Sequence, residues 1–188
     1  MNVEYYNEHR GYFAPLILDR GRVEGFWLIG NSYRNKSRLY GAYPPSYLQR
    51  MALLFPDAQR VLHLFSGSLH FKEDNIFTMD INPAMDPFVV GNAEEVDILC
   101  GGLLYFDLIL ADPPYERQHE RYGTEPVNRG KVIRACSRII KPGGHLCWLD
   151  TMQPMWAKKD GWRLAGTIGL NQSTNHKCRM ITILEKVA

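Results

Sequence analysis

Short apolar runs, separated by polar segments that contain glycine or proline, recur through the middle of the chain. These runs are continuous rather than alternating, which is typical of strands buried on both faces of a parallel sheet. Each gives way to polar or small residues where a strand would meet a loop. The strands predicted in this way are residues 61–65, 76–80, 88–90, 107–111 and 145–150.

Segments with other periodicities flank these strands. Residues 44–55 begin with Pro44, a favourable first residue for a helix, and residues 130–140 have helical spacing before a Lys-Pro-Gly-Gly stop. Residues 14–18 and 23–29 surround a polar turn and predict a β-hairpin. The remaining predicted elements are a short helix at 153–159 and two last strands at 162–170 and 178–186, joined by a polar loop at 171–177.

The alternation of strands and helices predicts an α/β fold. With 188 residues the chain is expected to form a single domain, with a hairpin and a basic, aromatic loop at 1–41 appended to a core at 42–188. Two connections are too short for ordinary crossover helices, namely 66–75 and 81–87, and the second contains two prolines. One face of the sheet therefore lacks two helices. We expect the N-terminal segment, the helix near residues 46–54 or a second chain, for example in a homodimer, to cover it.

Composition removes several classes of protein. No apolar run approaches the ~18 residues of a membrane span, and no charged-then-apolar leader opens the sequence, so a cytoplasmic protein is expected. The four cysteines form no C-x-x-C pair, so we expect neither a zinc site nor a disulfide framework.

Charge is distributed unevenly although the net charge is only +2. Residues 61–112 contain nine acids and one lysine, whereas residues 113–188 contain thirteen Lys and Arg against six acids. Clustered basic loops favour a phosphate backbone as partner, although ordinary solvated helix faces explain the same counts. Candidate nucleic-acid contacts lie in two polar loops, and they are Arg34, Lys36, Arg38, Arg117, His119 and Arg121.

The most specific chemical signal is Asp112-Pro113-Pro114-Tyr115, which ends an apolar run. Proline lacks a backbone N–H and has a fixed φ, so the turn is stiff and offers acceptors but few donors. The acceptors are the Asp112 carboxylate and the carbonyls of the turn, and Tyr115 adds an aromatic face. Such a loop suits a planar ring with an exocyclic NH₂, because its two hydrogens meet acceptors while the ring stacks on tyrosine.

Three further loops follow predicted strands. Phe65-Ser66-Gly67 is a small-residue loop after the first core strand, Asp80 ends the second, and Asn92-Ala93 follows the third. Open α/β sheets bind ligands at the carboxyl ends of their strands, and an acid at the end of the second strand commonly binds ribose hydroxyls. Each signal is weak alone, and together they indicate a nucleotide-like cofactor.

The order of these motifs resembles that of class I S-adenosylmethionine-dependent methyltransferases, in particular the amino-methyltransferases that act on nucleobases, especially adenine N6 in DNA. The resemblance implies a Rossmann-like, mostly parallel sheet with one antiparallel strand, here with reduced crossover helices after the first two strands. It implies that Asp112 and the Pro113 carbonyl hold the amine, within a loop completed by Pro114 and Tyr115. It also implies a set of residues around S-adenosylmethionine: Tyr43, Pro44, Phe65, Ser66, Gly67, Asp80, Asn92 and Ala93.

The sequence departs from this family at two positions. Leu69 stands where a second glycine is usual, and Asn92 replaces a more usual acid, although its side-chain oxygen can still accept from adenine N6. No segment is long enough for a separate target-recognition region. Specificity is therefore expected to be short or relaxed, or to come from another chain.

Other functions remain open at this stage. An RNA methyltransferase acting on adenine N6 or guanine N2 uses the same kind of loop, so DNA is preferred over RNA as the partner without being separated from it. A non-catalytic, methyltransferase-like module is favoured by Leu69 and the missing helices, and disfavoured by the intact Asp112–Tyr115 loop. A protein-glutamine methyltransferase is disfavoured because that group carries Asn at the position of Asp112.

Overall fold

The structure is a computed structural model that describes residues 1–30, 43–103, 105–115, 119–120, 123–172 and 175–187. Its helices are α1 (Val3–His9), α2 (Tyr47–Leu54), α3 (Val96–Leu99) and α5 (Arg129–Cys136). Its strands are β1 (Ile17–Asp19), β2 (Arg22–Ile29), β3 (Val61–Leu64), β4 (Ile76–Asp80), β5 (Val89–Val90), β6 (Phe106–Ala111), β7 (Ile140–Asp150), β8 (Trp162–Gln172) and β9 (Asn175–Lys186). Short 3₁₀ turns occupy Pro83–Met85, Ala93–Glu95, Gly101–Leu103 and Lys158–Asp160.

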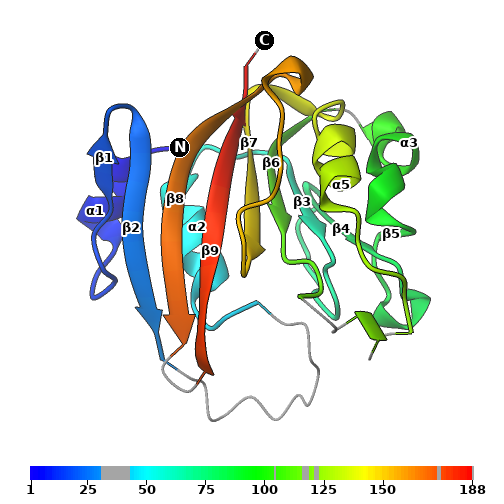
Figure 1. The fold of residues 1–188 in the computed structure, drawn as a ribbon, viewed down its shortest axis with the longest axis horizontal. Coiled ribbons are helices and arrows are strands. Elements are labelled where there is room, and N and C mark those ends of the chain that lie inside the picture. The colour runs from blue at the N-terminus through cyan, green and yellow to red at the C-terminus, as the bar shows by residue number, and fades with distance from the viewer. Residues whose placement is uncertain (31–42, 104, 116–118, 121–122, 173–174, 188) are drawn as a thin grey trace.

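The described strands form one sheet in the order β1-β2-β8-β9-β7-β6-β3-β4-β5 (Figure 1). Strands β2 to β8 all run in the same direction. Strand β9, which lies between β7 and β8 in the sheet, runs antiparallel to both. The prediction of an α/β, mostly parallel sheet is thus confirmed, with β9 as the antiparallel strand of the core. The edge strand β1 also runs antiparallel to its neighbour β2.

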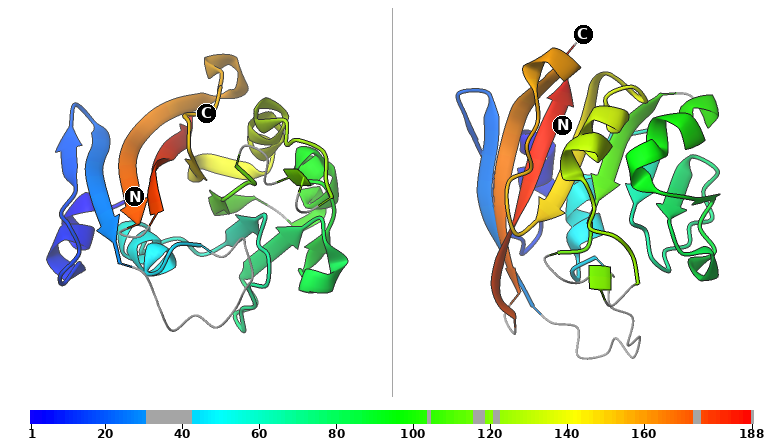
Figure 2. Two further views of the ribbon diagram at one scale, coloured as in Figure 1. Left: turned by 60° about the horizontal axis from the view of Figure 1, so that its bottom comes forward. Right: turned by 45° about the vertical axis from the view of Figure 1, so that its right-hand side comes forward.

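The N-terminal hairpin extends this sheet instead of standing apart from it (Figure 2). β2 pairs parallel with β8 from Val23↔Gly166 to Ile29↔Gln172. The two strands can approach closely because position 166 is glycine: a Cβ there would lie 2.5 Å from the Val23 carbonyl oxygen. Val23, Trp27 and Ile29 are buried, whereas Phe26 and Leu28 are exposed, as expected for a strand covered on one face.

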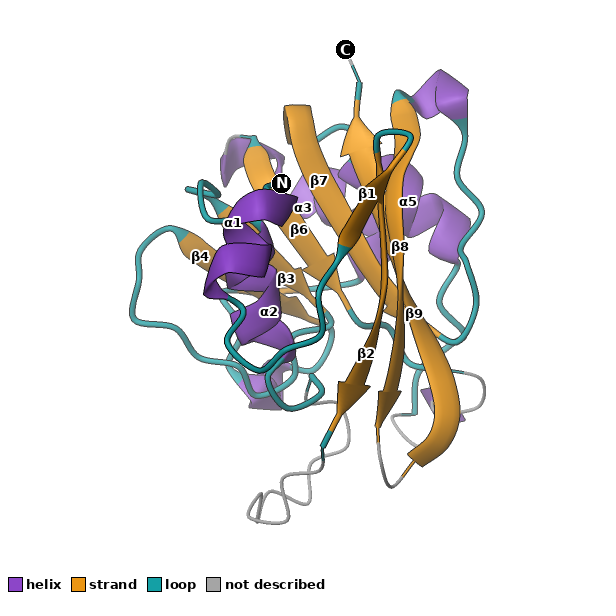
Figure 3. Cartoon of the chain, turned by 90° about the vertical axis from the view of Figure 1, so that its left-hand side faces the viewer, coloured by secondary structure: helices purple, strands orange, loops and turns teal. Residues whose placement is uncertain are grey.

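Helices lie on both faces of the sheet (Figure 3), and an apolar core lies on each face. One core lies under α3 and α5 and includes residues of β3, β4, β6 and β7. The other lies under α1, α2 and the N-terminal loop, where Tyr6, Phe13, Trp27, Tyr47 and Met51 pack on β6 to β9. The N-terminal segment and α2 therefore cover a large part of the face on which helices were expected to be missing. Coverage by a second chain stays a prediction.

The connections next to that covered area are short. Residues 65–75, all of them described, contain turns and no helix, and residues 81–88 contain only the turn Pro83–Met85. Phe71 from the first connection stacks on His63 of β3, with ring centroids 4.7 Å apart. A pocket of about 500 Å³ remains beside β4 on this face.

Three predicted boundaries were wrong. The helix expected at 153–159 is absent, because Pro154 lacks a backbone donor and Trp156 packs against the core, and only Lys158–Asp160 forms a 3₁₀ turn. The loop expected at 171–177 is much shorter, because β8 and β9 continue to a Gln172↔Asn175 pair. α5 ends at Cys136, and β7 already starts at Ile140.

Candidate active site

The Asp112–Tyr115 loop lies at the carboxyl edge of the sheet, between its two halves. Ala111, the last residue of β6, pairs with Leu64 of β3 on one side and with Trp148 of β7 on the other. From β3 the chain continues outward to β4 and β5, whereas β6 continues to β7 on the opposite side, so this is the topological switch point of the sheet. Ligands of open α/β sheets bind in the crevice at such a point.

Three polar side chains meet in this loop. The Tyr115 hydroxyl donates a hydrogen bond to Asp112 Oδ1, and Nη1 of Arg179 on β9 lies 3.5 Å from the Tyr115 hydroxyl oxygen. The Arg179 guanidinium also lies 5.8 Å from the centroid of the Tyr115 ring. Arg179 is 8% exposed, and its Nη2 has no hydrogen-bond partner among the described residues. The cluster thus contains an acid, a phenol and a buried cation.

Burial changes the protonation of this cluster. Removal from water raises the pKa of Asp112 to about 7, although the hydrogen bond from Tyr115 and the charge of Arg179 oppose the shift. Burial together with the nearby Asp112 charge also raises the pKa of Tyr115 well above its usual value, so the phenol keeps its proton near neutral pH. An aspartate with a pKa near 7 holds hydrogen-bond donors more strongly than an exposed aspartate does.

A second hydrogen-bond network, centred on Asp150, holds the loop through the Pro114 carbonyl. Asp150, the last residue of β7, is fully buried and accepts from Arg129 Nε at 2.6 Å and from Trp148 Nε1 at 3.1 Å. Nη2 of the same Arg129 lies 3.5 Å from the carbonyl oxygen of Pro114. Arg129 is the first residue of α5, so this ion pair ties the start of that helix to β7 and to the loop. Within the described residues, the Pro113 carbonyl has no hydrogen-bond donor.

The loop after β3 contains two residues with left-handed backbone, of which only the non-glycine Phe65 is strained. Phe65 and Gly67 both have positive φ, at 58° and 53°. Gly67 N donates to Asp80 Oδ2 at 2.8 Å, and Asn82 N donates to Oδ1 of the same carboxylate at 2.9 Å. The Ser66 hydroxyl is buried without a partner among the described residues, although buried polar groups are usually bonded. An unsatisfied hydroxyl beside a carboxylate with spare lone pairs fits a polar ligand at this edge.

The predicted adenine-contacting residues lie one strand further out. Gly91 N donates to the Asp80 carbonyl at 3.0 Å, which places the turn that starts at Asn92 beside the loop after β4. The Asn92 side-chain oxygen accepts from Glu94 N at 3.0 Å and so caps the Ala93–Glu95 turn. One lone pair of that oxygen is thus used locally and one remains. Ala93 is buried against the α3–α5 core.

Tyr43 connects the start of α2 with β6. Its hydroxyl donates to the Leu110 carbonyl at 3.2 Å, and its ring stacks on Tyr47 with centroids 4.9 Å apart. Burial and the charge of Asp112 raise the pKa of the Tyr43 phenol well above its usual value. Pro44 follows, and its carbonyl accepts from Tyr47 N in the first turn of α2. Both residues therefore lie at the carboxyl edge, on the α2 side of Asp112.

Most of the predicted substrate contacts fall outside the described residues, namely Arg34, Lys36, Arg38, Arg117 and Arg121. His119 is described: it is half-buried in a helical turn, and its carbonyl accepts from Thr124 N at 3.1 Å. All six substrate contacts thus remain predictions, and only His119 among them lies within the described residues.

Sequence reasoning missed Arg179 and Asp150, and it missed that Arg129 links Asp150 to the Pro114 carbonyl. Arg179 and Asp150 carried a detectable signal, because both are charged residues next to long apolar strand runs, where a charge is expected to have a partner or a function. The contacts themselves join elements distant in the chain: Asp150 of β7 pairs with Arg129 of α5, and Arg179 of β9 lies beside Tyr115 after β6. A linear sequence does not provide those contacts.

The described ranges contain no group of three or more His, Cys, Asp or Glu side chains placed to hold a metal ion. All four cysteines are free thiols, and Cys100, Cys136 and Cys147 are buried. None of the described helices combines the length and the apolar character needed to cross a membrane.

Comparison with known proteins finds a likeness in fold only. No family model and no curated protein sequence matches the chain. Among solved structures, TrmN from Thermus thermophilus aligns with a TM-score of 0.60 at 19% identity, over 80% of this chain and 51% of TrmN. A TehB-like SAM-dependent methyltransferase from Corynebacterium glutamicum aligns with a TM-score of 0.51 at 13% identity, over 72% of this chain and 84% of that protein.

The chain therefore spans about half the length of TrmN, and at these identities the likeness establishes architecture alone. The strand order, the single antiparallel core strand and the polar loops at the carboxyl edge agree with that architecture. We conclude that the chain has the α/β, Rossmann-like fold of S-adenosylmethionine-dependent methyltransferases.

Proposed function

We propose that this protein transfers a methyl group from S-adenosylmethionine to an exocyclic amine of a nucleobase, with adenine N6 of DNA as the first substrate to test. The observation that carries the proposal is the loop at the switch point, where the half-buried Asp112 accepts from Tyr115 and the Pro113 carbonyl lacks a donor among the described residues. An amine with two hydrogens requires two acceptors with spare lone pairs, and the Asp112 carboxylate and the Pro113 carbonyl provide them.

The residues of three loops would hold the cofactor. Phe65, Ser66 and Gly67 would contact its methionine part, with Tyr43 and Pro44 closing that end from the α2 side. Asp80 would accept from the ribose, and the Asn92–Ala93 turn would contact the adenine. The buried, unpartnered Ser66 hydroxyl and the spare lone pairs of Asp80 and Asn92 support this fit. When bound, S-adenosylmethionine supplies a methyl group activated by its sulfonium charge.

The chain's own residues act on the amine. An aromatic amine is a poor nucleophile because its lone pair is delocalised into the ring. Asp112 and the Pro113 carbonyl would accept its two hydrogens, which favours a pyramidal nitrogen with a localised lone pair. Tyr115 would stack on the base, and Arg129 would keep the loop in place through Pro114 and Asp150. A base in a duplex would have to be flipped out to reach this loop.

The hydrogen bond from Tyr115 to Asp112 leaves room for the amine on the same carboxylate. Tyr115 occupies Oδ1 of Asp112, but a carboxylate offers about four acceptor sites, so the amine can share the group. Arg179 Nη1 is close enough to donate to the Tyr115 oxygen if the Tyr115 hydroxyl hydrogen turns away from Asp112. We therefore assign Arg179 to positioning Tyr115 and to keeping Asp112 ionised.

The test is transfer of a labelled methyl group to duplex DNA and to structured RNA, followed by nucleoside analysis of the product. The proposal predicts label in N6-methyladenine from DNA. Label in N6-methyladenine or N2-methylguanine from RNA would retain the amine chemistry and change the substrate. The solved structures do not separate the two, because likeness at 19% identity and below indicates fold alone. Cofactor binding without label in either nucleic acid would contradict the proposal.

A further inference from the structure

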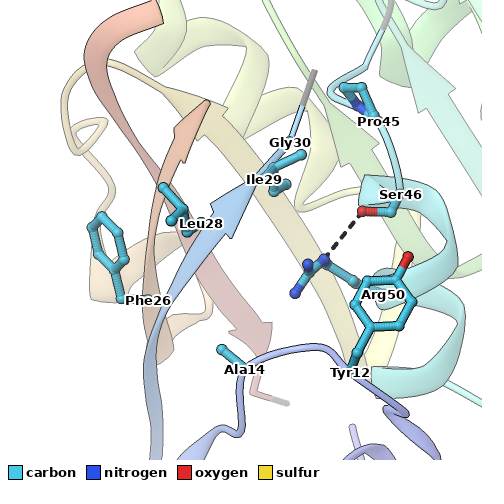
Figure 4. A pocket seen from close by; sticks show the side chains of 9 residues that line it. All are labelled: Tyr12, Ala14, Phe26, Leu28, Ile29, Gly30, Pro45, Ser46 and Arg50. Atoms are coloured by element: carbon cyan, nitrogen blue, oxygen red, sulfur yellow. Dashed lines mark hydrogen bonds between the residues drawn. The ribbon is translucent and has the colours of Figure 1, made fainter. Parts of the chain in front are cut away.

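A pocket of about 520 Å³ lies away from the Asp112 loop, between the end of β2 and the start of α2 (Figure 4). We call it the β2–α2 pocket. Gly30 and Ile29 form one side, Pro45, Ser46 and Arg50 form the other, and Tyr12 lies at its rim. The Arg50 side chain extends from α2 toward β2, into the space between the two elements (Figure 4).

Arg50 is a buried cation without a counter-ion. It is 3% exposed, and no carboxylate of the described residues forms an ion pair with it. Its Nε donates to the Ser46 hydroxyl at 3.3 Å, its guanidinium lies 3.9 Å from the Phe13 ring centroid, and its Nη1 has no partner among the described residues. The guanidinium also lies 5.1 Å from the Trp27 ring centroid, and because burying a charge is costly unless it is paired, an anion would complete this arrangement.

The start of α2 adds partial positive charge beside that of Arg50. The backbone N–H groups of a helix's first turn carry partial positive charge, and anions bind there. α2 has eight residues with no acid in its first turn, and Ser46, its N-cap, makes no capping hydrogen bond with its side chain. The Ser46 hydroxyl accepts from Arg50 and still has its own proton to donate.

This set of groups selects the class of anion. A guanidinium fork and a hydroxyl that line the same pocket beside the start of a helix suit the several oxygens of a phosphate. Tyr12, whose ring is almost fully exposed, stands at the rim and offers a stacking face for a base next to that phosphate.

The pocket also lies on the correct edge of the sheet. β2 is parallel to β8, and β6 is parallel to β7. Because β9 runs antiparallel to both β7 and β8, all four strands share one direction. β2 and β6 therefore end at the same edge, where α2 begins (Figures 1 and 2). Tyr43, bonded to Leu110 next to Asp112, is two residues before Pro45 of the pocket. The catalytic loop and the pocket thus flank the same short segment. We propose that the β2–α2 pocket binds one backbone phosphate of the nucleic-acid substrate, a proposal that rests on the proposed function.

The test measures how the affinity for a short DNA or RNA depends on salt. Each lost phosphate contact lowers the slope of log K against log salt by about one. Gly30→Asp places a carboxylate beside Arg50, and it should fold because a Cβ at Gly30 meets nothing within 4 Å and its φ is not positive. Gly102→Asp is the matched control, since its Cβ is equally unhindered and it lies outside the pocket. We expect Gly30→Asp to lower the slope by about one and Gly102→Asp to leave it unchanged.

A second readout addresses Arg50 itself. In the wild type, inorganic phosphate should shift the NMR signal of the Arg50 Nε–H group, and the shift should be lost in Gly30→Asp and kept in Gly102→Asp. Equal salt slopes for the two variants, in a protein that binds nucleic acid and transfers methyl groups, would overturn the phosphate site and leave the proposed function intact. A wild-type protein that binds neither DNA nor RNA would overturn both.

Discussion

At the scale of single residues, Asp112 is the group whose environment decides the chemistry. It is half-buried, and its removal from water raises its pKa to about 7 although the hydrogen bond from Tyr115 and the charge of Arg179 oppose the shift. Arg179 comes from β9 and Asp112 from the end of β6, so the combination depends on three-dimensional contact. The chemical motif was readable in the sequence, whereas its electrostatic partner was not.

The raised pKa predicts the pH dependence of activity. The amine needs an ionised Asp112 as acceptor, so kcat/KM should be low below pH 7, rise as the pH passes through about 7 and level off above it. The Tyr115 hydrogen bond lowers this pKa, so Tyr115→Phe should move the midpoint to higher pH and reduce the rate only mildly on the plateau. Measured pH–rate profiles check both. An unchanged midpoint in Tyr115→Phe would show that the hydroxyl does not interact with Asp112 in solution.

At the scale of elements, a contact between a strand end and a helix start holds the Asp112–Tyr115 loop, and Asp80 at the end of β4 holds the loops on either side of it. The strands and the two longer helices were readable from apolar runs and helical spacing, because those patterns follow directly from which faces are buried. The helix expected at 153–159 and the loop expected at 171–177 were wrong, because strand pairing and packing override local propensity. The ion pair between Arg129 and Asp150 links a helix start to a strand end, and no local pattern predicts it.

This ion pair should dominate the stability of the site. Arg129→Met would leave the fully buried Asp150 without its cation, which should reduce the free energy of unfolding by about 3 kcal/mol. The control is Arg138→Met, because Arg138 pairs with Asp97 at 2.7 Å but is largely exposed, and its loss should cost less than about 1 kcal/mol. Urea denaturation of the two variants makes the comparison. Equal losses would mean that the Arg129 pair is only a surface contact.

At the scale of the whole molecule, the first thirty residues extend the sheet with β1 and β2 and cover one of its faces with α1 and the loop that follows it. Tyr6, Phe13 and Trp27 from the first thirty residues pack on the face shared with α2. The need for such a cover followed from connection lengths alone, whereas the addition of β2 in parallel beside β8 did not. Parallel pairing of strands so distant in sequence leaves no local trace.

The cover predicts a large difference between adjacent residues of β2. Trp27→Ala should reduce the free energy of unfolding by about 3–5 kcal/mol, because Trp27 is fully buried. Phe26→Ala, one position away on the exposed face, should cost less than about 1 kcal/mol. Thermal or urea unfolding distinguishes them.

The cover also predicts the behaviour of a shortened chain. A chain that starts at residue 41 should aggregate or self-associate in light scattering, and a stable, monomeric truncated chain would contradict the role of the cover.

The central claim is that Asp112 holds the amine during transfer, and single-turnover methyl transfer by Asp112→Ala tests it most directly. The interaction strengthens as the nitrogen becomes pyramidal, so its loss should appear in the rate of transfer and not in cofactor binding. We expect the rate to fall at least about 100-fold, or about 3 kcal/mol, with S-adenosylmethionine affinity by calorimetry nearly unchanged. Asp57→Ala, at an exposed aspartate, should behave as the wild type does. Wild-type turnover in Asp112→Ala, on a nucleic acid that the wild type methylates, would show that the loop only ends a strand.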